Sequence, residues 1–480
     1  MRRIRLYDTL SRETRLFQPL VPPRVGLFVC GLTPYADAHI GHGKVAVTFD
    51  AFARALRRWG YRVFYIQNVT NIDDRLIATG GATGQDPLVL ADRHFAAWRS
   101  DMEWLGIRSV NDYPHATDFV PEIVVQIRQL IDGGFAYPAN GSVYYDVAKF
   151  PRYGELSGQK TEALRPGARV EPEPGKRAPA DFVLWKAATP GEPTWDSPWG
   201  PGRPGWHIED TAITVRMLGP RYDVHGAGLD LKFPHHEAEI AQAEAATGES
   251  PLVNFWMHVG LLTMKGEKMS KSLGNVYGLH EALEEFGPEV VRFYYLNAHY
   301  RSPLDFVPGQ SLEEAREAYG SLRGAADRLR SELLAAGAER TGEELSMAQV
   351  EEAGRTIELL DEALSEDFNT REAIAALFSW SGRAAAAMAR LEHLSSDSLS
   401  TLLSPFDWAA EVLGLCGGIP LAESTVIPEV VQASLDARAR ARDRGDFPEA
   451  DRIRDALAAA GIVVEDHGGV TRWRLRGTAR

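Results

Sequence analysis

Two histidines and two glutamates stand close together in the segment FPHHEAE, residues 233–239, where a helix is expected to start. Residues four apart lie on one face of a helix, so His235 and Glu239 can point at a common spot. His236 and Glu237 are then expected to point elsewhere. One imidazole and one carboxylate make half of a typical zinc shell. Taken alone, the segment is better explained as a solvated helix start, whose glutamates complement the helix dipole.

The tetrapeptide HIGH, residues 39–42, stands where an expected strand gives way to a helix. Helix starts attract phosphate through their backbone N–H groups and the helix dipole. Gly41 allows a nucleotide to approach the backbone closely, and His39 and His42 offer hydrogen-bond donors to phosphate charge. By itself, the tetrapeptide is also compatible with an ordinary helix start that carries two histidines.

The segment KMSKS, residues 268–272, follows an expected strand, so Lys268 and Lys271 can swing from a loop onto a triphosphate. A cluster of lysines is usually only a solvated surface loop. Here, however, the segment follows HIGH at a distance of more than 200 residues. This pair of motifs resembles the signature of class I aminoacyl-tRNA synthetases.

The resemblance implies that an amino acid is activated by ATP. When the substrate carboxylate attacks the α-phosphorus, negative charge builds up on the phosphate oxygens and on the departing pyrophosphate, so donors and cations lower the barrier. This transition-state stabilisation is assigned by the resemblance to His39, His42, Lys268 and Lys271. No covalent intermediate with the protein is required.

The same resemblance implies further ATP contacts. Within HGAGLDL, Gly228 permits close approach and Asp230 can accept a hydrogen bond from a ribose hydroxyl. Val259 belongs to the segment that is similar to the adenine-side strand of the family, and Gly41 and Lys271 complete the expected ATP site. Without the family context, a plain glycine turn explains the first segment equally well. A core strand is the alternative for the second.

Cys30 closes the expected strand just before HIGH, at the same edge of the sheet. A cysteine at a strand end is usually small core filling. In this arrangement, however, Cys30, His235 and Glu239 are similar to the zinc ligands of cysteinyl-tRNA synthetases, which the chain resembles from about residue 5 to residue 476. Further matches to that family are DFVLWK, WDSPWGPGRPGWHIE, NVTNIDDR, DFNT and TRWR.

The chain departs from the family pattern at Asp210, because the family usually has a second cysteine ligand after GWHIE. A carboxylate keeps the ligand charge of a thiolate but is a harder donor. We expect Cys30, Asp210, His235 and Glu239 to bind one Zn²⁺ and to leave room for the substrate thiolate. The alternatives are that Asp210 only accepts a hydrogen bond next to the metal, or that the metal is weakly bound or lost.

Zinc would explain how cysteine is selected. A pocket separates cysteine from serine poorly, because the two differ by one atom. A thiol deprotonates readily on zinc, whereas a hydroxyl has a far higher pKa and is a poorer ligand. The resemblance also places Gly31, Thr70 and Trp206 against the bound cysteine, with ordinary packing as the alternative for each.

Composition bounds the class of protein. With 480 residues, the chain is expected to form two to four units. The formal net charge of -14 argues against indiscriminate polyanion binding, and the two cysteines suit a reducing compartment. The start MRRIRLYDTL lacks a signal-peptide core, and no apolar run is long enough to span a bilayer. We therefore expect a cytoplasmic protein without a membrane partner.

The elements that must position these residues are of the α/β class. RVGLFVCGL reads as a strand, the segment from HIGH as a helix, and YRVFYIQNV as a second strand, which together form a βαβ unit. A long stripe of apolar residues from Ser311 onwards predicts helices.

The expected order of domains is a Rossmann-like parallel-sheet catalytic domain, a helical bundle and a small C-terminal unit. The expected bounds are: catalytic domain 1–275, insertion about 120–204, connecting segment 276–310, tRNA-binding bundle 311–418, anticodon-recognition unit 425–480.

The expected activity is attachment of L-cysteine to the 3′ end of tRNA(Cys), with ATP and Mg²⁺, by a monomer. The basic end GVTRWRLRGTAR suggests tRNA contacts, although a frayed tail is an alternative; the residues are Arg472, Trp473 and Arg474. Two other functions remain open: a cysteine ligase that acts on a small amino sugar, as in mycothiol synthesis, and a non-catalytic tRNA-binding paralogue. Roughly 170 residues beyond Ser311 suit a tRNA rather than a small acceptor. Intact HIGH and KMSKS argue against a non-catalytic protein.

Overall fold

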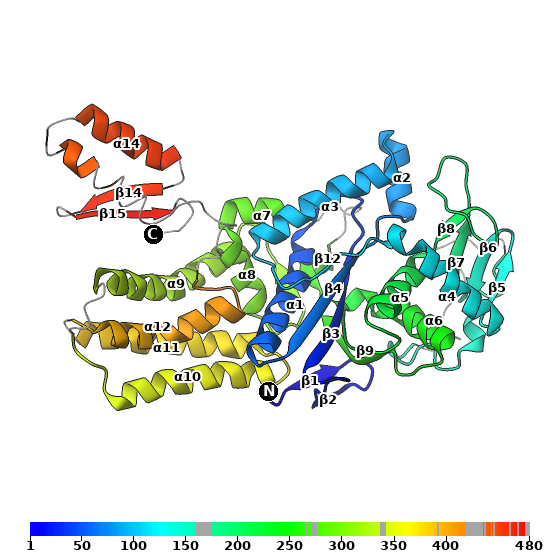
Figure 1. The fold of residues 1–480 in the computed structure, drawn as a ribbon, viewed down its shortest axis with the longest axis horizontal. Coiled ribbons are helices and arrows are strands. Elements are labelled where there is room, and N and C mark those ends of the chain that lie inside the picture. The colour runs from blue at the N-terminus through cyan, green and yellow to red at the C-terminus, as the bar shows by residue number, and fades with distance from the viewer. Residues whose placement is uncertain are drawn as a thin grey trace.

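The computed structural model describes most of the chain. The described residues are 1–159, 175–264, 266–269, 276–336, 342–390, 393–417, 435, 438–442, 444, 447–459, 462–467 and 470–475. Figure 1 shows the parallel sheet near the middle, the helical bundle on one side of it and a smaller sheet on the other.

The central sheet is fully parallel. Its strands, in the order β10-β9-β3-β4, have the bounds β10 Val253–Val259, β9 Tyr222–Gly228, β3 Arg24–Leu32 and β4 Arg62–Val69. Helix α1, Ile40–Arg58, connects β3 to β4 as predicted. Parallel strands that are covered on both faces read as nearly continuous apolar runs, which is why RVGLFVCGL was readable as a strand. The Rossmann-like α/β class is confirmed.

The two faces of this sheet pack against different cores. Leu27 and Val29 of β3 join the core that includes α1, whereas Phe28 and Cys30 join a second core. Because side chains alternate along a strand, this places Cys30 on the face opposite α1. The second core is covered by α5, Trp206–Met217, and by α6, Glu237–Thr247, with the short segments η4, Leu229–Leu231, and η5, Lys232–His236, before α6.

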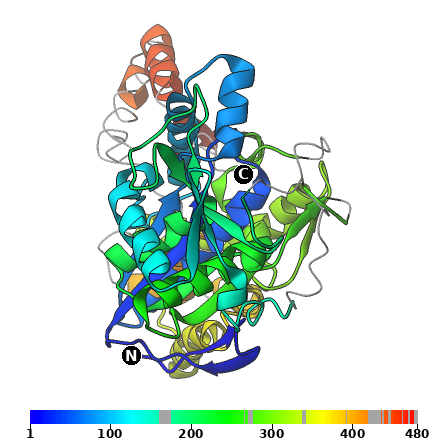
Figure 2. The same cartoon turned by 90° about the vertical axis from the view of Figure 1, so that its right-hand side faces the viewer.

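The expected insertion contains a second sheet. Its four antiparallel strands follow the order β5-β6-β7-β8 and have these bounds: β5 Ala136–Ala139, β6 Ser142–Tyr145, β7 Phe182–Ala187 and β8 Gly202–Pro204. Figure 2 looks onto this side of the molecule. The helical elements before β7 are α2 Asp74–Thr83, α3 Pro87–Trp104, η1 Ala116–Phe119, α4 Val120–Asp132 and η2 Val147–Lys149. The last of these strands, β8, leads directly into α5.

The strand expected just before KMSKS, over FWMHVGLLTM, is confirmed in its first half but is divided, because the chain forms two strands there. After β10, the chain leaves the central sheet at Gly260, where a Cβ atom would lie 2.4 Å from the Arg301 carbonyl oxygen. It then enters a three-stranded sheet of β11 Leu262–Met264, β12 Glu267–Lys268 and β13 Leu304–Phe306. The remaining elements of this half are β1 Arg5–Asp8, β2 Glu13–Leu16, α7 Leu279–Phe286 and α8 Pro288–Leu296.

The helical part follows as predicted. The bundle consists of α9 Ser311–Ala336, α10 Met347–Ser365, α11 Thr370–Arg390 and α12 Ser396–Val412. The C-terminal elements are α14 Phe447–Ala459 and an antiparallel pair of strands, β14 Ile462–His467 and β15 Val470–Leu475. Among the described residues, no helix combines the length and apolar character that a membrane crossing requires.

Arg292 links the helical bundle to the catalytic half through hydrogen bonds and an ion pair. Its guanidinium is fully buried and donates to the Leu413 carbonyl at the end of the bundle and to the Leu105 carbonyl. It also lies 2.9 Å from the Asp50 carboxylate of α1. The buried carboxylate supplies the counter-charge that a buried guanidinium needs. The helix that starts at HIGH is therefore tied to the end of the bundle.

Candidate active site

The HIGH segment forms a reciprocal helix cap. His39 is the N-cap of α1, and its Nδ1 accepts a hydrogen bond from the Gly41 N–H at 3.1 Å. In return, His42 Nδ1 accepts from the His39 N–H at 3.2 Å, and the two rings stack with centroids 3.9 Å apart. The Nδ1 atoms thus serve the helix start, and Nε2, on the opposite side of each ring, is the nitrogen that can donate to phosphate.

Three of the expected nucleotide residues, Gly228, Asp230 and Val259, lie at or just beyond the carboxyl ends of the strands, the edge where open parallel sheets bind ligands. Gly228 and Val259 end β9 and β10 and are register partners. Asp230 follows in η4, and a Cβ atom on Gly228 would lie 2.7 Å from its Oδ1. A side chain on Gly228 would therefore displace the Asp230 carboxylate. A Cβ atom on Gly41 would likewise lie 2.9 Å from the His39 ring and would displace that ring.

The KMSKS segment is described only at its start. Lys268 ends β12, where its backbone pairs with Thr263, and Met269 is buried. The side chain of Lys268 and the whole of Lys271 lie outside the described residues. Lys268, which the sequence placed in a loop, is therefore the last residue of a short strand.

Cys30, Asp210, His235 and Glu239 converge on one buried point, although four separate elements carry them. The Cys30 thiol lies 3.6 Å from Asp210 Oδ2. His235 Nε2 lies 3.0 Å from that oxygen and 2.9 Å from Glu239 Oε1. All four residues are buried, which excludes the alternative of a solvated helix start for His235.

The cluster has an excess of acids. Burial raises the pKa of the Cys30 thiol well above its usual value, and Glu239 and Asp210 add to the rise. Burial lowers the pKa of His235, but Glu239 and Asp210 outweigh burial and raise it. The Cys30 thiol therefore stays protonated without a cation, because one imidazolium could not also balance a thiolate beside two carboxylates in a region of low dielectric. A bound cation would remove this imbalance.

The donors fit a zinc ion. Ligands at the usual 2.0–2.3 Å from one tetrahedral zinc lie roughly 3–4 Å from each other, close to the distances of 2.9, 3.0 and 3.6 Å observed here. Oε1 of Glu239 is buried and accepts no hydrogen bond in the described part of the chain, although His235 Nε2 is near. An oxygen in that state suits a cation that binds among these four side chains.

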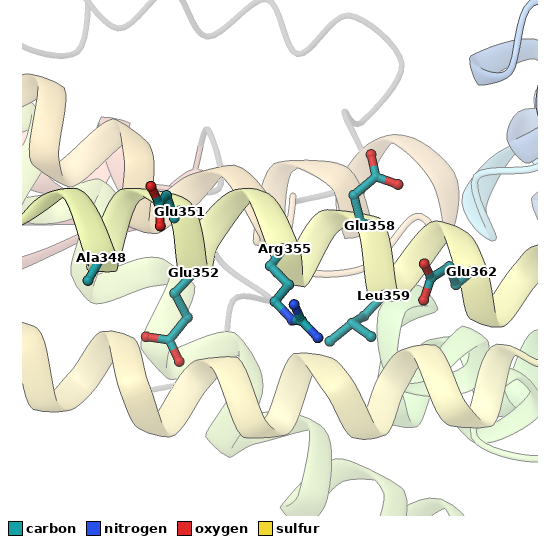
Figure 3. A pocket seen from close by; sticks show the side chains of 7 residues that line it. All are labelled: Ala348, Glu351, Glu352, Arg355, Glu358, Leu359 and Glu362. Carbon is teal, nitrogen blue, oxygen red and sulfur yellow. The ribbon is translucent and has the colours of Figure 1, made fainter.

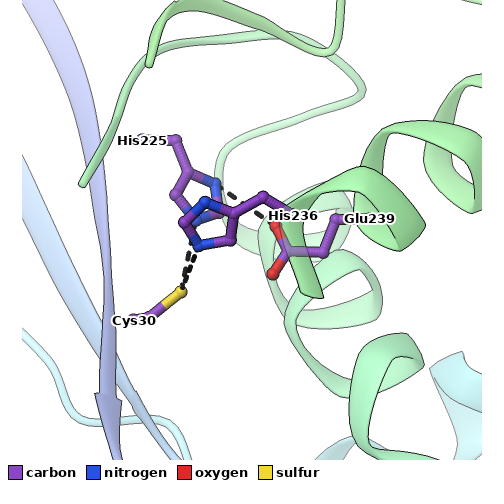
Figure 4. Close-up of side chains that lie close together, drawn as sticks. All are labelled: Cys30, His225, His236 and Glu239. Carbon is purple, nitrogen blue, oxygen red and sulfur yellow. Dashed lines mark hydrogen bonds and ion pairs between the residues drawn. The ribbon is translucent and has the colours of Figure 1, made fainter. Parts of the chain in front are cut away.

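A second set of ligand-type atoms overlaps the first. Figure 4 shows Cys30 and Glu239 together with His225 and His236. The Cys30 sulfur lies 3.3 Å from His225 Nε2 and 3.2 Å from His236 Nε2. The expectation that His236 points elsewhere is therefore wrong, because its ring reaches Cys30 as well, from the last residue of η5. Glu237 does point elsewhere, and accepts from backbone N–H groups of Gly154, Leu156 and Ser157.

These inner histidines were missed by the sequence interpretation. Burial lowers the pKa of His225, His236 and His258, so each imidazole is neutral near pH 7 and carries one N–H. Tyr222 Oη lies 2.7 Å from His225 Nδ1, and His258 Nε2 lies 2.8 Å from His236 Nδ1. Their only signal in the sequence was a histidine within each of three buried segments.

Three further residues surround the cluster. Trp206 begins α5 and stacks on His235 with ring centroids 4.4 Å apart. Gly31 follows Cys30, and a Cβ atom there would lie 1.8 Å from the Asn68 carbonyl oxygen, so only glycine fits. Thr70, just beyond β4, is 3% exposed. The structure therefore brings all three expected substrate contacts to the edge of the cluster.

Glu209 was also missed. It is fully buried next to Asp210, and neither of its carboxylate oxygens has a hydrogen-bond partner in the described chain. Burial raises its pKa well above the usual value, and Asp210 and Asp73 add to the rise. Its place in α5, one residue before an expected metal ligand, was the available signal. A raised pKa favours the neutral carboxylic acid, which adds no negative charge to the cluster.

The expected tRNA residues lie in β15. The backbones of Arg472, Trp473 and Arg474 pair with Glu465, Val464 and Val463 of β14. Their side chains lie outside what the structure describes. The tRNA contacts of these three residues therefore stay a prediction.

A surface hollow of about 550 Å³ lies along α10, apart from the residues above (Figure 3). Four glutamates and one arginine line it together with Ala348 and Leu359; the charged residues are Glu351, Glu352, Arg355, Glu358 and Glu362. This excess of carboxylates repels RNA phosphates. We therefore expect this side of α10 to face away from a bound tRNA.

Three family models match successive parts of the chain. The catalytic domain of class I (C) tRNA synthetases matches residues 16–317, a DALR domain matches residues 360–417, and the anticodon binding domain of cysteinyl-tRNA ligases matches residues 425–474.

Similar proteins cover the whole chain. Cysteine–tRNA ligases of Methylobacillus flagellatus and Pseudomonas aeruginosa are each 43% identical to it, over 98% of this chain and 99% of the relative. Among solved structures, methionyl-tRNA synthetase of Mycobacterium tuberculosis in complex with methionyl-adenylate has a TM-score of 0.60 at 16% identity, and covers 84% of this chain and 92% of its own. The similarity to this methionyl-tRNA synthetase structure shows a shared fold and nothing further.

Proposed function

Because the chain belongs to the cysteine–tRNA ligases of the class I aminoacyl-tRNA synthetase family, we propose that Cys30, Asp210, His235 and Glu239 bind Zn²⁺ and select cysteine for activation. The observation that carries this proposal is the convergence of the four buried side chains, with one carboxylate oxygen left without a hydrogen bond. The chain is an ATP-dependent ligase. It joins L-cysteine to the 3′ end of tRNA(Cys).

Activation proceeds by attack of the cysteine carboxylate on the α-phosphorus of ATP, which enters with Mg²⁺. A bond forms between a carboxylate oxygen and the α-phosphorus as the bond between that phosphorus and pyrophosphate breaks. Nε2 of His39 and of His42 donates to the phosphate oxygens that gain charge, because Nδ1 of each ring is already engaged in the helix cap. Gly228, Asp230 and Val259 hold the nucleoside at the carboxyl ends of β9 and β10.

Zinc bound by the four side chains would supply the distinction between a thiol and a hydroxyl, since a thiol on zinc ionises at neutral pH. Asp210 takes the place of the family's usual cysteine and keeps its charge. Trp206 stacks on His235, and His207 Nδ1 lies 2.8 Å from His235 Nδ1, so both neighbours restrict the orientation of that ring. Gly31 and Thr70 contact the rest of the amino acid.

The acceptor is a tRNA. The anticodon-binding match over residues 425–474 and the near-complete coverage by cysteine–tRNA ligases support this choice over a small amino sugar or a non-catalytic role. We assign tRNA contacts to Arg472, Trp473 and Arg474 in β15 and to the bundle surface away from the acidic hollow of α10. The cytoplasmic location, the monomeric state and the domain boundaries stay predictions.

Purified protein is expected to hold about one zinc per chain. It should catalyse ATP–pyrophosphate exchange with cysteine but not with serine, and it should charge tRNA but not glucosaminyl-inositol. Elemental analysis, exchange and acceptor assays on one preparation measure these properties. Selectivity for cysteine without bound zinc would contradict the metal proposal and leave the ligase activity in place.

Replacing Lys271 by alanine should lower exchange by about 10²-fold or more, because a cation that meets the developing phosphate charge is lost. The matched control is Lys149→Ala, which removes an exposed lysine from η2. Zinc content should be unchanged in both variants. Exchange at the native rate in Lys271→Ala would show that this lysine has no part in activation.

A further inference from the structure

We propose that Asn68 is a positioning residue that makes Asp210 bind metal through one oxygen. With one oxygen occupied by Asn68, the carboxylate offers the metal a single donor atom, like the cysteine sulfur that the family usually has at this position. The inference rests on the proposed zinc site and adds a determinant of metal affinity that is specific to a chain with aspartate at this position.

The orientation of the Asn68 amide is fixed by a backbone group. The Gly31 N–H donates to Asn68 Oδ1 at 2.7 Å. Since a backbone N–H can only donate, the amide oxygen must face Gly31, and the NH₂ group must face the other way. Asn68 is 3% exposed, so water does not compete for these bonds.

The NH₂ group is directed at the proposed metal ligand. Asn68 Nδ2 donates to Asp210 Oδ1 at 2.5 Å and to Thr70 Oγ1 at 3.3 Å. The other oxygen of Asp210, Oδ2, lies 3.6 Å from the Cys30 sulfur and 3.0 Å from His235 Nε2. The two oxygens therefore have different partners. Oδ1 is occupied by the amide, and Oδ2 alone faces the other ligands.

This division matters because a carboxylate can bind a metal through one oxygen or through both, whereas a thiolate has one donor atom. A hydrogen bond that occupies Oδ1 favours binding through Oδ2 and holds the carboxylate in one rotamer. Partners of this kind commonly change metal affinity 10–100-fold. Asn68 itself is held at the end of β4, where Gly31 and the Asn68 backbone approach so closely that no Cβ fits between them.

The test compares Asn68→Ala in two backgrounds, the native chain and Asp210→Cys. In the native chain, we expect the zinc dissociation constant to rise about 10–100-fold. In Asp210→Cys, the same change should alter it about twofold or less, because the single sulfur needs no choice between two donor atoms. Competition with a chromophoric chelator measures the constants. In Co²⁺-loaded protein, the visible d–d bands should weaken only for Asn68→Ala with Asp210 present, because a carboxylate that binds through both oxygens raises the coordination number.

Each outcome decides the question. Equal zinc affinity with and without the Asn68 amide in the native background would overturn the inference. Equal losses in both backgrounds would also overturn it, because they would reveal a general role in holding β3 and β4 together. If Asn68→Ala does not fold, Asn68→Ser in the same two backgrounds makes the comparison. Native protein that binds no zinc would contradict the metal proposal itself, a failure distinct from the two above.

Discussion

Cys30→Ala is expected to remove zinc and to lower cysteine-dependent exchange by about 10³-fold or more, since the loss of a ligand also removes the distinction between thiol and hydroxyl. The chain offers a matched control in its other cysteine. Cys416 is buried at the end of the bundle, and the part of the chain that the structure describes shows no metal-type cluster around it. The Cys416→Ala variant should still bind zinc at the proposed site. Only its free energy of unfolding should fall, by a value on the order of 1–2 kcal/mol.

Cys30 belongs to both overlapping sets of ligand-type atoms, so a second comparison separates the sets. His235→Ala should lose zinc, because His235 belongs to the proposed set alone. His236→Ala should keep it. Metal content after dialysis, measured together with thermal unfolding, distinguishes these results. Retention of zinc by His235→Ala and its loss from His236→Ala would assign the metal to the inner histidines.

The double variant His39→Asn/His42→Gln should lose activation without losing the helix start. Asparagine is among the best N-cap residues, and glutamine three positions later completes a capping box, so both backbone N–H groups that the histidines now satisfy keep partners. The Nε2 donors are removed. Exchange should fall by about 10²–10³-fold for each donor. The melting temperature should stay within a few degrees of the native value.

The control for this prediction is His39→Ala/His42→Ala, which removes the cap and the donors together. It should lose exchange to a similar extent and should also be less stable, by about 1 kcal/mol for a lost N-cap. A loss of exchange at native stability in the Asn/Gln variant would therefore result from the loss of the Nε2 donors. Near-native exchange in the Asn/Gln variant would mean that the two histidines serve only as caps.

The sequence alone identified the parts of the site that depend on local spacing. HIGH at the junction of a strand and a helix, and His235 four residues before Glu239, follow from the periods of strands and helices. The parallel sheet was predictable because an apolar strand, an amphipathic helix and a second apolar strand can pack in few ways. The family resemblance then supplied the ligand roles, and the close relatives confirm the family.

Tertiary structure decided what lies between these parts. Asp210 is 180 residues from Cys30 and 25 from His235, and Asn68 is 142 residues from Asp210. No local period relates such positions. They meet because the ends of parallel strands share one edge of the sheet and because α5 and α6 cover the same face. The contact of His236 with Cys30 is likewise tertiary, because the two residues are 206 positions apart in the sequence.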